Sequence, residues 1–402
     1  MDSNHPFQAV KISENVYWVG AIDWDLIEFH GYRTERGTTY NAFLVMADKV
    51  TLIDTVKKRY KREFLSRLRS VIDPNDIDII VSNHSEMDHS GLLPDIVELI
   101  QPEKLYASSN GAKALTEHFG DTVNVETVKS GDSVDLGDMK LTFVETKMIH
   151  WPDSMVSFLD SDGIVFSQDA FGMHLATSNL FAEDNDRHIM QHEAEKYYAN
   201  IVLPYSKIVA KTLDALQSMN LPIQMIAPDH GPLWRGDDDI AFVLELYKRF
   251  VAQPPTPAAV VLYDTMWEST DIMAKAVAEG LRQGGVRVQV FNLHTSHRSD
   301  VVTAVMNSGA LVVGSPTLNS GIFPTLADAL TYIKGLQPMN LIGAFFGSYG
   351  WNQKGMKELG EFVDKIGMDI VADPLSVKFV PTDEDLEACA ELGRTVAGRL
   401  KQ

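Results

Sequence analysis

The segment NHSEMDHSG at residues 83–91 places two histidines and two acids within six consecutive positions. His84, Glu86 and Asp88 alternate, so an extended backbone would direct their side chains to the same side. His89 follows Asp88 directly and offers an imidazole from another direction. Imidazole and carboxylate are the ligands of many transition-metal sites. The segment therefore predicts a loop that serves two metal ions.

Further metal-competent side chains follow apolar stretches that look like strands. LTFVETKMI ends at His150, GIVFSQ ends at Asp169, and IQMIAP leads to His230. A lone histidine at a strand end is more often a hydrogen-bonded structural residue, but a cluster of this size is much less expected by chance. We predict a dinuclear site in which Asp169, which comes from a separate strand, bridges the ions. The seven candidate ligands offer nitrogen and oxygen and no sulfur: His84, Glu86, Asp88, His89, His150, Asp169 and His230.

A second constellation consists of three polar loops that follow apolar strands. DTMWEST (264–270) precedes a helix-like stretch, and its hydroxyls with the helix N-terminus could bind an anion. It lacks the glycines of GxGxxG and the lysine of a P-loop. SPTLNSG (315–321) and GSYGWNQ (347–353) would lie at the same sheet edge and could hold a planar heterocycle. A plain helix cap at 264–270, or a fold without cofactor, is the alternative.

The elements that must position these residues fall on either side of QPPTPA, a proline-rich connector at 253–258. The pattern predicts an α/β domain over 1–252 and a second domain over 259–402. In the first domain we expect a hairpin at 41–55, strands at 77–83, 141–149, 163–168 and 223–228, and helices at 90–100 and 207–219. In the second, a strand at 258–264 and a helix at 271–285 begin a regular β-α alternation, which is typical of a doubly wound, flavodoxin-like sheet.

Composition excludes several classes of function. The 402 residues carry 55 acids against 35 Lys and Arg, and a formal charge of −20 opposes wide contact with nucleic acid or anionic lipid. No apolar run approaches a bilayer span and no signal pattern begins the chain, so we expect a cytoplasmic protein. The basic run KKRYKR (57–62) is either a solvated face or a docking patch for an acidic partner.

The chain has one cysteine, Cys389, which excludes an intrachain disulfide, a Cys-ligated iron–sulfur cluster and a rubredoxin-type module. Redox chemistry would therefore need a bound cofactor or a His/carboxylate metal site. The loop at 83–91, together with LIDT at 52–55, resembles the metallo-β-lactamase superfamily, whose signature is H-x-H-x-D-H. Here Glu86 replaces the second imidazole. A site richer in carboxylate favours iron over a dizinc hydrolase centre.

Both halves together resemble the flavodiiron proteins, of the rubredoxin:oxygen oxidoreductase type. GTTYNAFLV, IHWPDSM, YYANIV, SPTLNSGIFP and FGSYGW carry the resemblance. It implies a metallo-β-lactamase-like αββα sandwich followed by a flavodoxin-like doubly wound parallel sheet. It also implies one iron on His84, Glu86 and His150, a second on Asp88, His89 and His230, and Asp169 between them. Family members differ in whether the histidine matching His89 reaches its iron.

The resemblance further implies FMN in the three loops and two residues near the irons, His30 and Tyr197, as second-shell or proton-donating groups. The implied FMN residues are Thr265, Met266, Trp267, Glu268, Ser269, Thr270, Ser315, Pro316, Thr317, Leu318, Asn319, Gly321, Ser348, Tyr349, Gly350 and Trp351.

The activity so implied is four-electron reduction of O2 to water, with electrons from rubredoxin or a similar small protein. Reduction of NO to N2O at the same sites is an alternative, and a dizinc hydrolase or a non-catalytic redox sensor are others. The resemblance also implies a head-to-tail homodimer in which FMN of one subunit lies beside the irons of the next. Trp351 is a candidate contact across that interface.

Overall fold

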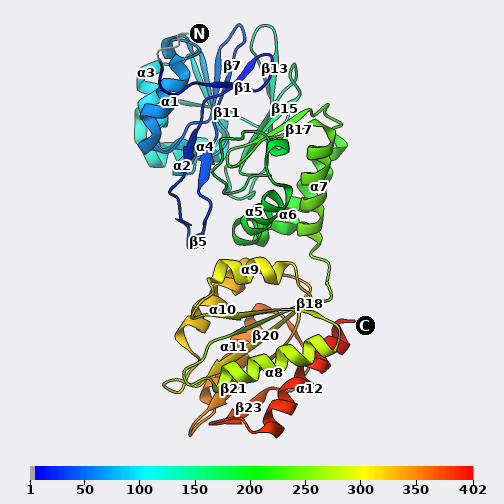
Figure 1. The fold of residues 1–402 in the computed structure, drawn as a ribbon. Helices are drawn as coiled ribbons and strands as arrows, with labels where there is room; N and C mark the ends of the chain where they lie inside the picture. Colours follow the sequence, from blue (N-terminus) through cyan, green and yellow to red (C-terminus); the bar gives the residue numbers. More distant parts are fainter. Residues whose placement is uncertain (1–4, 402) are drawn as a thin grey trace. The chain divides into compact units, whose positions relative to one another are not determined.

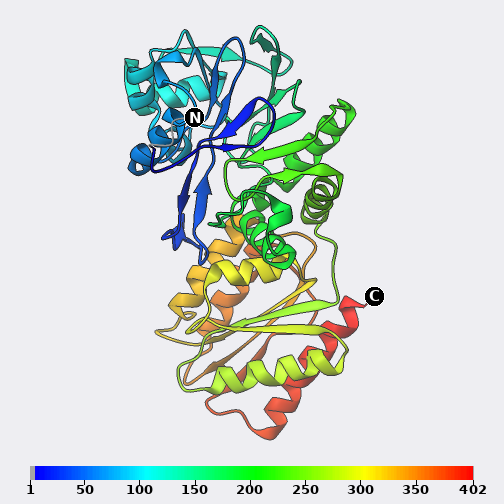
Figure 2. The same cartoon turned by 45° about the horizontal axis from the view of Figure 1, so that its top comes forward.

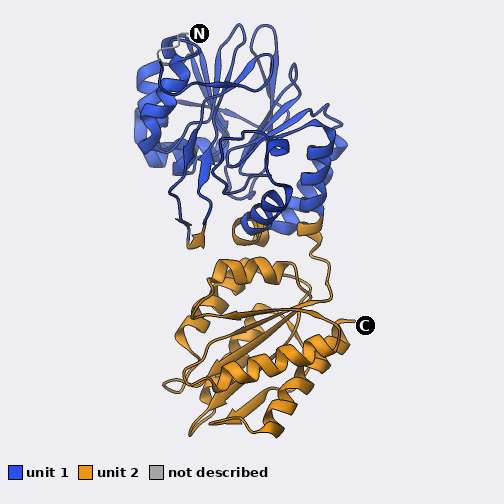
Figure 3. Cartoon of the chain, in the orientation of Figure 1, with its two compact units in different colours: residues 1–30, 34–197, 205–248 blue, residues 31–33, 198–204, 249–402 orange. Residues whose placement is uncertain are grey.

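The computed structural model describes residues 5–401 and divides into two compact units, shown in Figure 3. Unit 1 comprises the chain up to residue 30, 34–197 and 205–248, and unit 2 comprises 31–33, 198–204 and the chain from 249 onward. The domain bounds 1–252 and 259–402 stay a prediction. The sequence did not indicate that the two short segments would group with unit 2.

Unit 1 is built on two large sheets, which Figures 1 and 2 show in two views. The first has the order β1-β2-β7-β8-β9-β10-β11, with bounds Val10–Lys11, Val16–Trp18, Phe43–Val45, Thr51–Ile53, Ile79–Ser82, Lys104–Ser108 and Val125–Val128. The second has the order β12-β13-β14-β15-β16-β17, with bounds Ser133–Asp135, Lys140–Glu145, Met155–Leu159, Ile164–Gln168, Met225–Pro228 and Trp234–Arg235. Two small pairs, β3-β6 (Ala21–Asp23, Thr38–Tyr40) and β4-β5 (Glu28–Phe29, Tyr32–Arg33), complete the strands.

The core of unit 1 lies between the two sheets. Phe43 and Val81 of the first sheet and Phe143 and Phe166 of the second belong to one buried cluster. Helices cover the outer faces: α1 (Lys61–Arg69), α3 (Leu93–Ile100) and α4 (Ser109–Phe119) share a second buried cluster with the first sheet. The helices α5 (Arg187–Tyr197) and α6 (Ser206–Ser218) lie between β15 and β16 in the chain, and α7 (Gly236–Ala252) follows β17. The predicted αββα sandwich is confirmed.

Two predicted elements in unit 1 end differently from the expectation. The strand predicted over 141–149 stops at Glu145, because the chain then turns, with the Ile149 amide donating to the Thr146 carbonyl at 3.0 Å and Met148 at φ 66°. The helix predicted over 90–100 is two helices, α2 (Met87–Ser90) and α3. Pro94 lies in the first turn of α3, where proline is tolerated. Both departures shape the site described below.

Unit 2 is a parallel sheet of order β19-β18-β20-β21-β22, with β23 also paired to β21. The strand bounds are Arg287–Asn292, Ala258–Tyr263, Ala310–Pro316, Ile342–Tyr349, Asp369–Ile370 and Leu375–Lys378. The helices are α8 (Ser269–Gln283), α9 (Arg298–Met306), α10 (Pro324–Leu336), α11 (Lys354–Ile366) and α12 (Asp383–Leu400). In chain order the sheet reads 2-1-3-4-5, which is the flavodoxin order. The predicted flavodoxin-like sheet is confirmed.

No helix within residues 5–401 is long and apolar enough to cross a membrane. Cys389 is fully buried on α12, and burial raises its pKa to about 12.

Candidate metal centre and cofactor pocket

The seven candidate ligands lie together in unit 1 as two adjacent groups. Within each group, the ligating atoms lie within 4.8 Å of one another. Six of the seven residues are buried, and His150 is nearly so. The first group is His84, Glu86, His150 and Asp169, and the second is Asp88, His89 and His230.

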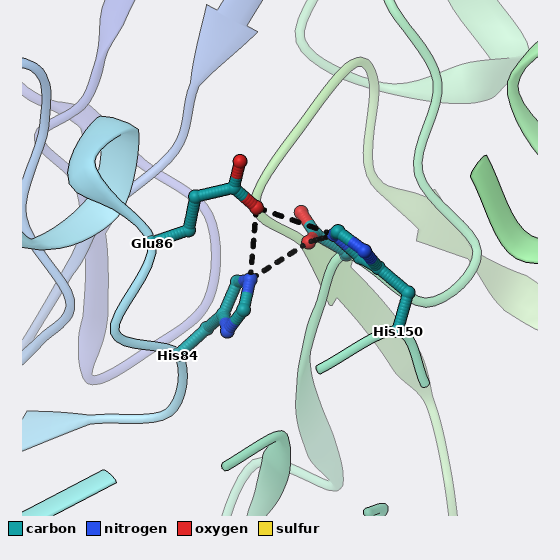
Figure 4. Close-up of side chains that lie close together, drawn as sticks. His84, Glu86 and His150 are labelled. Atoms are coloured by element: carbon teal, nitrogen blue, oxygen red, sulfur yellow. Dashed lines mark hydrogen bonds and ion pairs between the residues drawn. The ribbon is translucent and has the colours of Figure 1, made fainter. Parts of the chain in front are cut away.

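In the first group, the side chains converge on a common point, as Figure 4 shows for His84, Glu86 and His150. Glu86 Oε2 lies 3.2 Å from His84 Nε2 and 3.3 Å from His150 Nε2. Asp169 Oδ2 lies 3.3 Å from His84 Nε2 and 3.0 Å from His150 Nε2. Two imidazole nitrogens and two carboxylate oxygens thus face one another.

The other oxygen of Asp169 faces the second group. Asp169 Oδ1 lies 3.3 Å from His89 Nε2 and 3.5 Å from His230 Nε2. Asp88 completes the group, with Oδ1 3.4 Å from His89 Nε2 and Oδ2 3.3 Å from His230 Nε2. Asp169 therefore directs one oxygen to each group, which is the geometry of a bridging carboxylate. His89 directs its Nε2 into the second group.

The residues present fit two metal ions. Both Asp88 oxygens, Asp169 Oδ1 and His89 Nε2 are buried without a hydrogen-bond partner among the described residues. Leaving a buried polar atom unsatisfied costs about 1–3 kcal/mol, and more for a charged group. A cation within reach of these atoms would remove that cost. Nitrogen and oxygen donors without sulfur suit first-row transition metals.

Neighbouring groups fix the histidine rings for this role. His84 Nδ1 donates to Asp153 Oδ2 at 3.1 Å, and the Ser85 amide donates to the same oxygen at 2.6 Å. His230 Nδ1 donates to the Thr39 carbonyl at 2.7 Å. In each ring the donating Nδ1 leaves Nε2 as the atom available to a metal, which would replace the Nε2 proton.

The ligand loop is held by the strand before it. Asp54 accepts from the Asn83 amide at 2.7 Å and from Asn83 Nδ2 at 3.0 Å, which is the part played by the acid of LIDT. The expectation of an extended loop is wrong after Glu86, because Met87 begins α2. The helical turn rotates Asp88 and His89 away from the direction of His84 and Glu86. That turn is why the four residues divide between two groups.

Charges within the site shift the pKa values in opposite directions. Burial lowers the pKa of His84, but hydrogen bonds to Asp153, Asp169 and Glu86 outweigh it and raise the pKa well above its usual range. The same balance raises the pKa of His150 to about 9. Burial raises the pKa of Asp169, but the surrounding imidazoles hold it well below its usual range. The carboxylates are therefore ionised and strongly attract positive charge.

His30 and Tyr197, the two residues expected beside the irons, both lie near the metal ligands. His30 follows β4, and its Nε2 donates to Glu86 Oε1 at 2.6 Å, while 59% of its side chain stays exposed. That hydrogen bond raises the pKa of His30. Tyr197 is buried at the end of α5, with its ring centroid 6.2 Å from that of His230. Burial holds its pKa well above the usual range.

A third such residue, His174, received no role from the sequence. It is fully buried, its Nδ1 lies 2.9 Å from Thr38 Oγ1, and its ring centroid lies 4.8 Å from that of His230. Burial holds the pKa of His174 well below its usual range, so the ring is neutral. Its position five residues after Asp169 was the signal that could have identified it.

The three polar loops of unit 2 line one cavity of about 520 Å³. This volume is within the range of cofactor sites. The predicted residues that line it are Thr265, Met266, Trp267, Ser269, Pro316, Thr317, Leu318, Asn319, Ser348, Tyr349, Gly350 and Trp351. Glu268, Thr270, Ser315 and Gly321 are not among its lining residues.

Two of these four support the wall from behind. Thr270 Oγ1 lies 2.9 Å from Ser348 Oγ, which joins the first loop to the third. Ser315 Oγ accepts from the Phe323 amide at 3.1 Å. Ser320 and Asn352 also line the cavity and belong to the predicted loops without having been assigned to FMN, whereas the sequence missed two lining residues entirely, Phe379 and Val380. The last two follow β23, and the apolar run SVKFV before Pro381 was the signal for a fourth strand-end loop.

The cavity fits a flavin mononucleotide. Thr265 Oγ1 is buried without a hydrogen-bond partner in the described chain, at the loop before α8 where a phosphate would bind. A Cβ on Gly350 would lie 3.3 Å from the Phe379 ring, so glycine allows the backbone of this loop to pack closely against that ring. Trp267 and Trp351 are 88% and 90% exposed and offer faces for stacking.

The basic run at 57–62 makes contacts within the chain. Lys58 and Lys61 each pair with Asp95, at 3.0 and 2.9 Å. Lys57 lies over the rings of Phe29 and Tyr40, 5.1 and 4.8 Å from their centroids. The docking role of this run stays a hypothesis.

Comparison with known proteins identifies relatives of both halves of the chain. Residues 38–231 match the model of the ODP family beta lactamase, and residues 261–393 match that of flavodoxin. The rubredoxin-oxygen oxidoreductase of Megalodesulfovibrio gigas is 43% identical over 98% of both chains. The nitric oxide reductase of Moorella thermoacetica is 42% identical over 98% of this chain and 99% of its own.

Solved structures extend the likeness to the backbone. The rubredoxin oxygen:oxidoreductase of Desulfovibrio gigas superposes with a TM-score of 0.96, covering 98% of this chain and 99% of its own at 43% identity. The flavodiiron protein of Giardia intestinalis superposes with a TM-score of 0.94 at 30% identity, covering 98% of this chain and 97% of its own. The chain belongs to the flavodiiron protein family.

Proposed function

We propose that this protein is a flavodiiron oxygen reductase that reduces O2 to water with four electrons. The observation that carries the proposal is Asp169, whose two oxygens each face one complete group of metal ligands. The same chain holds a cavity that fits FMN. The relative of Megalodesulfovibrio gigas, named a rubredoxin-oxygen oxidoreductase, supports the reaction class.

The cofactors account for the electron count, because a diferrous pair supplies two electrons and reduced FMN supplies two more. In the proposed assignment, His84, Glu86 and His150 would hold one iron and Asp88, His89 and His230 would hold the other, with Asp169 shared between the two groups. The chain orients these ligands through Asp153 and the Thr39 carbonyl.

Two residues are placed to handle protons. His30 holds a proton between its Nε2 and Glu86 Oε1 at 2.6 Å, and its exposed side chain can exchange that proton with solvent. Tyr197 keeps its hydroxyl proton because burial disfavours the phenolate. We propose that both supply protons to the reduced oxygens.

The test is anaerobic. The purified protein is analysed for metals and flavin, reduced fully, and mixed with O2 while both centres are followed. We expect about two irons and one FMN per chain, fast reoxidation of both centres, and no peroxide. Two zincs per chain, or slow flavin reoxidation with release of peroxide, would contradict the proposal and favour the dizinc hydrolase.

Reduction of NO to N2O is the second candidate, since the nitric oxide reductase of Moorella thermoacetica is 42% identical over nearly the whole chain. Coupling two NO molecules consumes two electrons, which the diiron pair supplies. Mixing the reduced protein with NO in place of O2 compares the two rates. A much faster reaction with NO changes the substrate and leaves the site assignment in place.

We also propose a head-to-tail homodimer and a rubredoxin-like electron donor. Exposed apolar residues surround the flavin cavity, with Trp351 90%, Trp267 88% and Val380 76% exposed. Others lie close in sequence to the metal ligands and to His30, with Ile27 72% and Met87 49% exposed. Exposed apolar groups such as those around the flavin cavity typically mark an interaction surface. The name of the Megalodesulfovibrio gigas relative supports the donor.

Light scattering of the wild type and of Trp351→Glu tests the dimer. The variant should dissociate and lose electron flow from FMN to iron while its iron stays bound, and FMN is kept saturating because Trp351 also lines the flavin cavity. A dimer that is unaffected by the charge would contradict the role of Trp351. Titration with reduced rubredoxin, compared with reduced ferredoxin, tests the donor.

A further inference from the structure

A small apolar cavity lies in unit 1 between α6 and the second sheet, with a volume of about 30 Å³. One water-sized sphere needs about 10–15 Å³ on this measure. The cavity is therefore large enough for one diatomic molecule. None of the proposed ligands lines it, and no step of the proposed reaction uses it.

The cavity is walled by one face of α6 and by two strands. Val209, Thr212, Leu213 and Leu216 line it at the spacing of a single helix stripe. The other lining residues include Val156 of β14, Val165 and Ser167 of β15, and Tyr247 of α7, and the rest of the wall comes from neighbouring turns. Thr212, Leu213 and Leu216 are only half-buried, so this wall lies close to the solvent.

The opposite end of the cavity reaches the turns that carry two proposed ligands. Ile149 precedes His150, Ala170 follows Asp169, and both line the cavity. These turns are tied together, because Gln168 Nε2 donates to the Ile149 carbonyl at 2.5 Å. The cavity thus extends from α6 to two residues, Ile149 and Ala170, that are the direct sequence neighbours of ligands in the first group.

The polar groups of the lining are poorly placed to hold water. Ser167 Oγ donates to the Ala170 carbonyl at 2.7 Å, and Tyr247 Oη accepts from the Phe171 amide at 2.6 Å. Thr146 Oγ1 has no partner among residues 5–401. A buried water typically makes two to four hydrogen bonds, and the hydroxyls of Thr146 and Thr212 would leave a water at the lower end of that range. Apolar cavities of this kind stay dry and take up apolar guests such as xenon.

We propose that this cavity binds an uncharged diatomic gas and passes it to the metal centre between Ile149 and Ala170. The proposal rests on the proposed function, which makes O2 or NO the guest. An apolar gas gains by leaving water for such a cavity, whereas the ions and water of the solvent do not. The route would be separate from the exposed side of the site at His30.

Xenon tests the binding step independently of iron and turnover. Crystals of the holoprotein under xenon pressure should show an anomalous peak between Val165 and Val209. Leu213→Ala enlarges the cavity and should raise xenon occupancy, and Val209→Phe fills it and should abolish the peak. A wild-type cavity without xenon, or with an ordered water, would overturn the proposal even if the protein reduces O2.

Stopped-flow reoxidation tests the delivery step. Val209→Phe should slow the second-order reaction of the reduced protein with O2 and with NO at least fivefold, with metal and flavin content unchanged. Ile208→Phe is the matched control, since Ile208 is the preceding residue of α6, is 37% exposed and does not line the cavity. Wild-type rates in Val209→Phe would show that the gas does not travel this way. If Val209→Phe does not fold, Leu213→Phe takes its place.

Discussion

The metal centre is closed and dense in charge, whereas the cofactor pocket is open and formed by loops. Asp169 and His84 are 2% and 1% exposed, but Trp351 at the flavin cavity is 90% exposed. The metal centre depends on the identity of each side chain, because only certain atoms coordinate a cation. The pocket depends on the shape of four strand-end loops. Single substitutions should therefore affect the two sites very differently.

The largest effect is expected at the shared carboxylate. Asp169→Asn keeps the shape of the side chain but removes its negative charge and one ligating oxygen, and both ligand groups use this residue. Iron content should fall from about two per chain to below one, and O2 reduction should be lost. Metal analysis and flavin absorbance measure this, and FMN should stay at one per chain. Two irons in the variant would contradict the bridging assignment.

A smaller effect is expected from the residue that orients His84. Asp153→Asn weakens the hydrogen bond to His84 Nδ1, which fixes the ring for its metal. Loss of such a partner typically costs 10–100-fold in metal affinity or activity. Iron affinity measured with a chelator should fall by about that factor. Asp162→Asn, at a carboxylate that accepts from Asn15 instead, is the control and should leave iron affinity unchanged.

The flavin side should tolerate single changes better. Phe379→Ala removes one aromatic wall of the cavity, and aromatic contacts contribute about 0.5–1.5 kcal/mol. The Kd for FMN, measured by fluorescence quenching on the apoprotein, should rise about threefold to tenfold. Glu268→Ala should leave the Kd unchanged, since Glu268 does not line the cavity. A larger rise in Kd for Glu268→Ala than for Phe379→Ala would show that FMN does not bind in this cavity.

The smallest effect concerns stability in unit 2. Partial burial raises the pKa of Asp271, but Lys275 at 2.6 Å and the Tyr263 hydroxyl outweigh it and lower the pKa below its usual value. A lowered carboxyl pKa stabilises the fold above the unfolded-state pKa near 4, and that stabilisation is lost as pH falls through the folded-state pKa. Asp271→Asn should therefore lower the free energy of unfolding at pH 7 by less than about 1 kcal/mol, with a small fall in Tm, and the loss should shrink as the pH is lowered towards 2. A loss of equal size at both pH values would exclude the charge as its cause.

The metal centre, which depends on side-chain identity, was easier to predict from the sequence than the cofactor pocket, which depends on loop shape. The seven candidate ligands were identified from residue type and strand-end position, and the structure brings all seven together. Their division into two groups depends on the turn of α2, which the alternation in H-x-E-x-D-H does not indicate. His174 was missed because its only signal, a position five residues after Asp169, lies in a turn and not at a strand end.

In the cofactor pocket, the sequence located the loops but not each lining residue. A residue type does not show whether a side chain faces the cavity or supports its wall from behind. Ser269 lines the cavity, whereas the neighbouring and chemically similar Thr270 contacts Ser348 instead. Phe379 and Val380 were missed because β23 is short and its loop is apolar. The two folds were predictable because apolar periodicity and proline-rich breaks determine strand and helix order.

The ligands of the metal centre come from both sheets of the sandwich. His84 to His89 follow β9 of the first sheet, whereas His150, Asp169 and His230 follow strands of the second. In a chain with a single cysteine, bound metal would thus be a cross-link that adds to the apolar core between the two layers. Separating the sheets would require breaking several coordination bonds at once. Release of the metals and unfolding of the sandwich should therefore be one event.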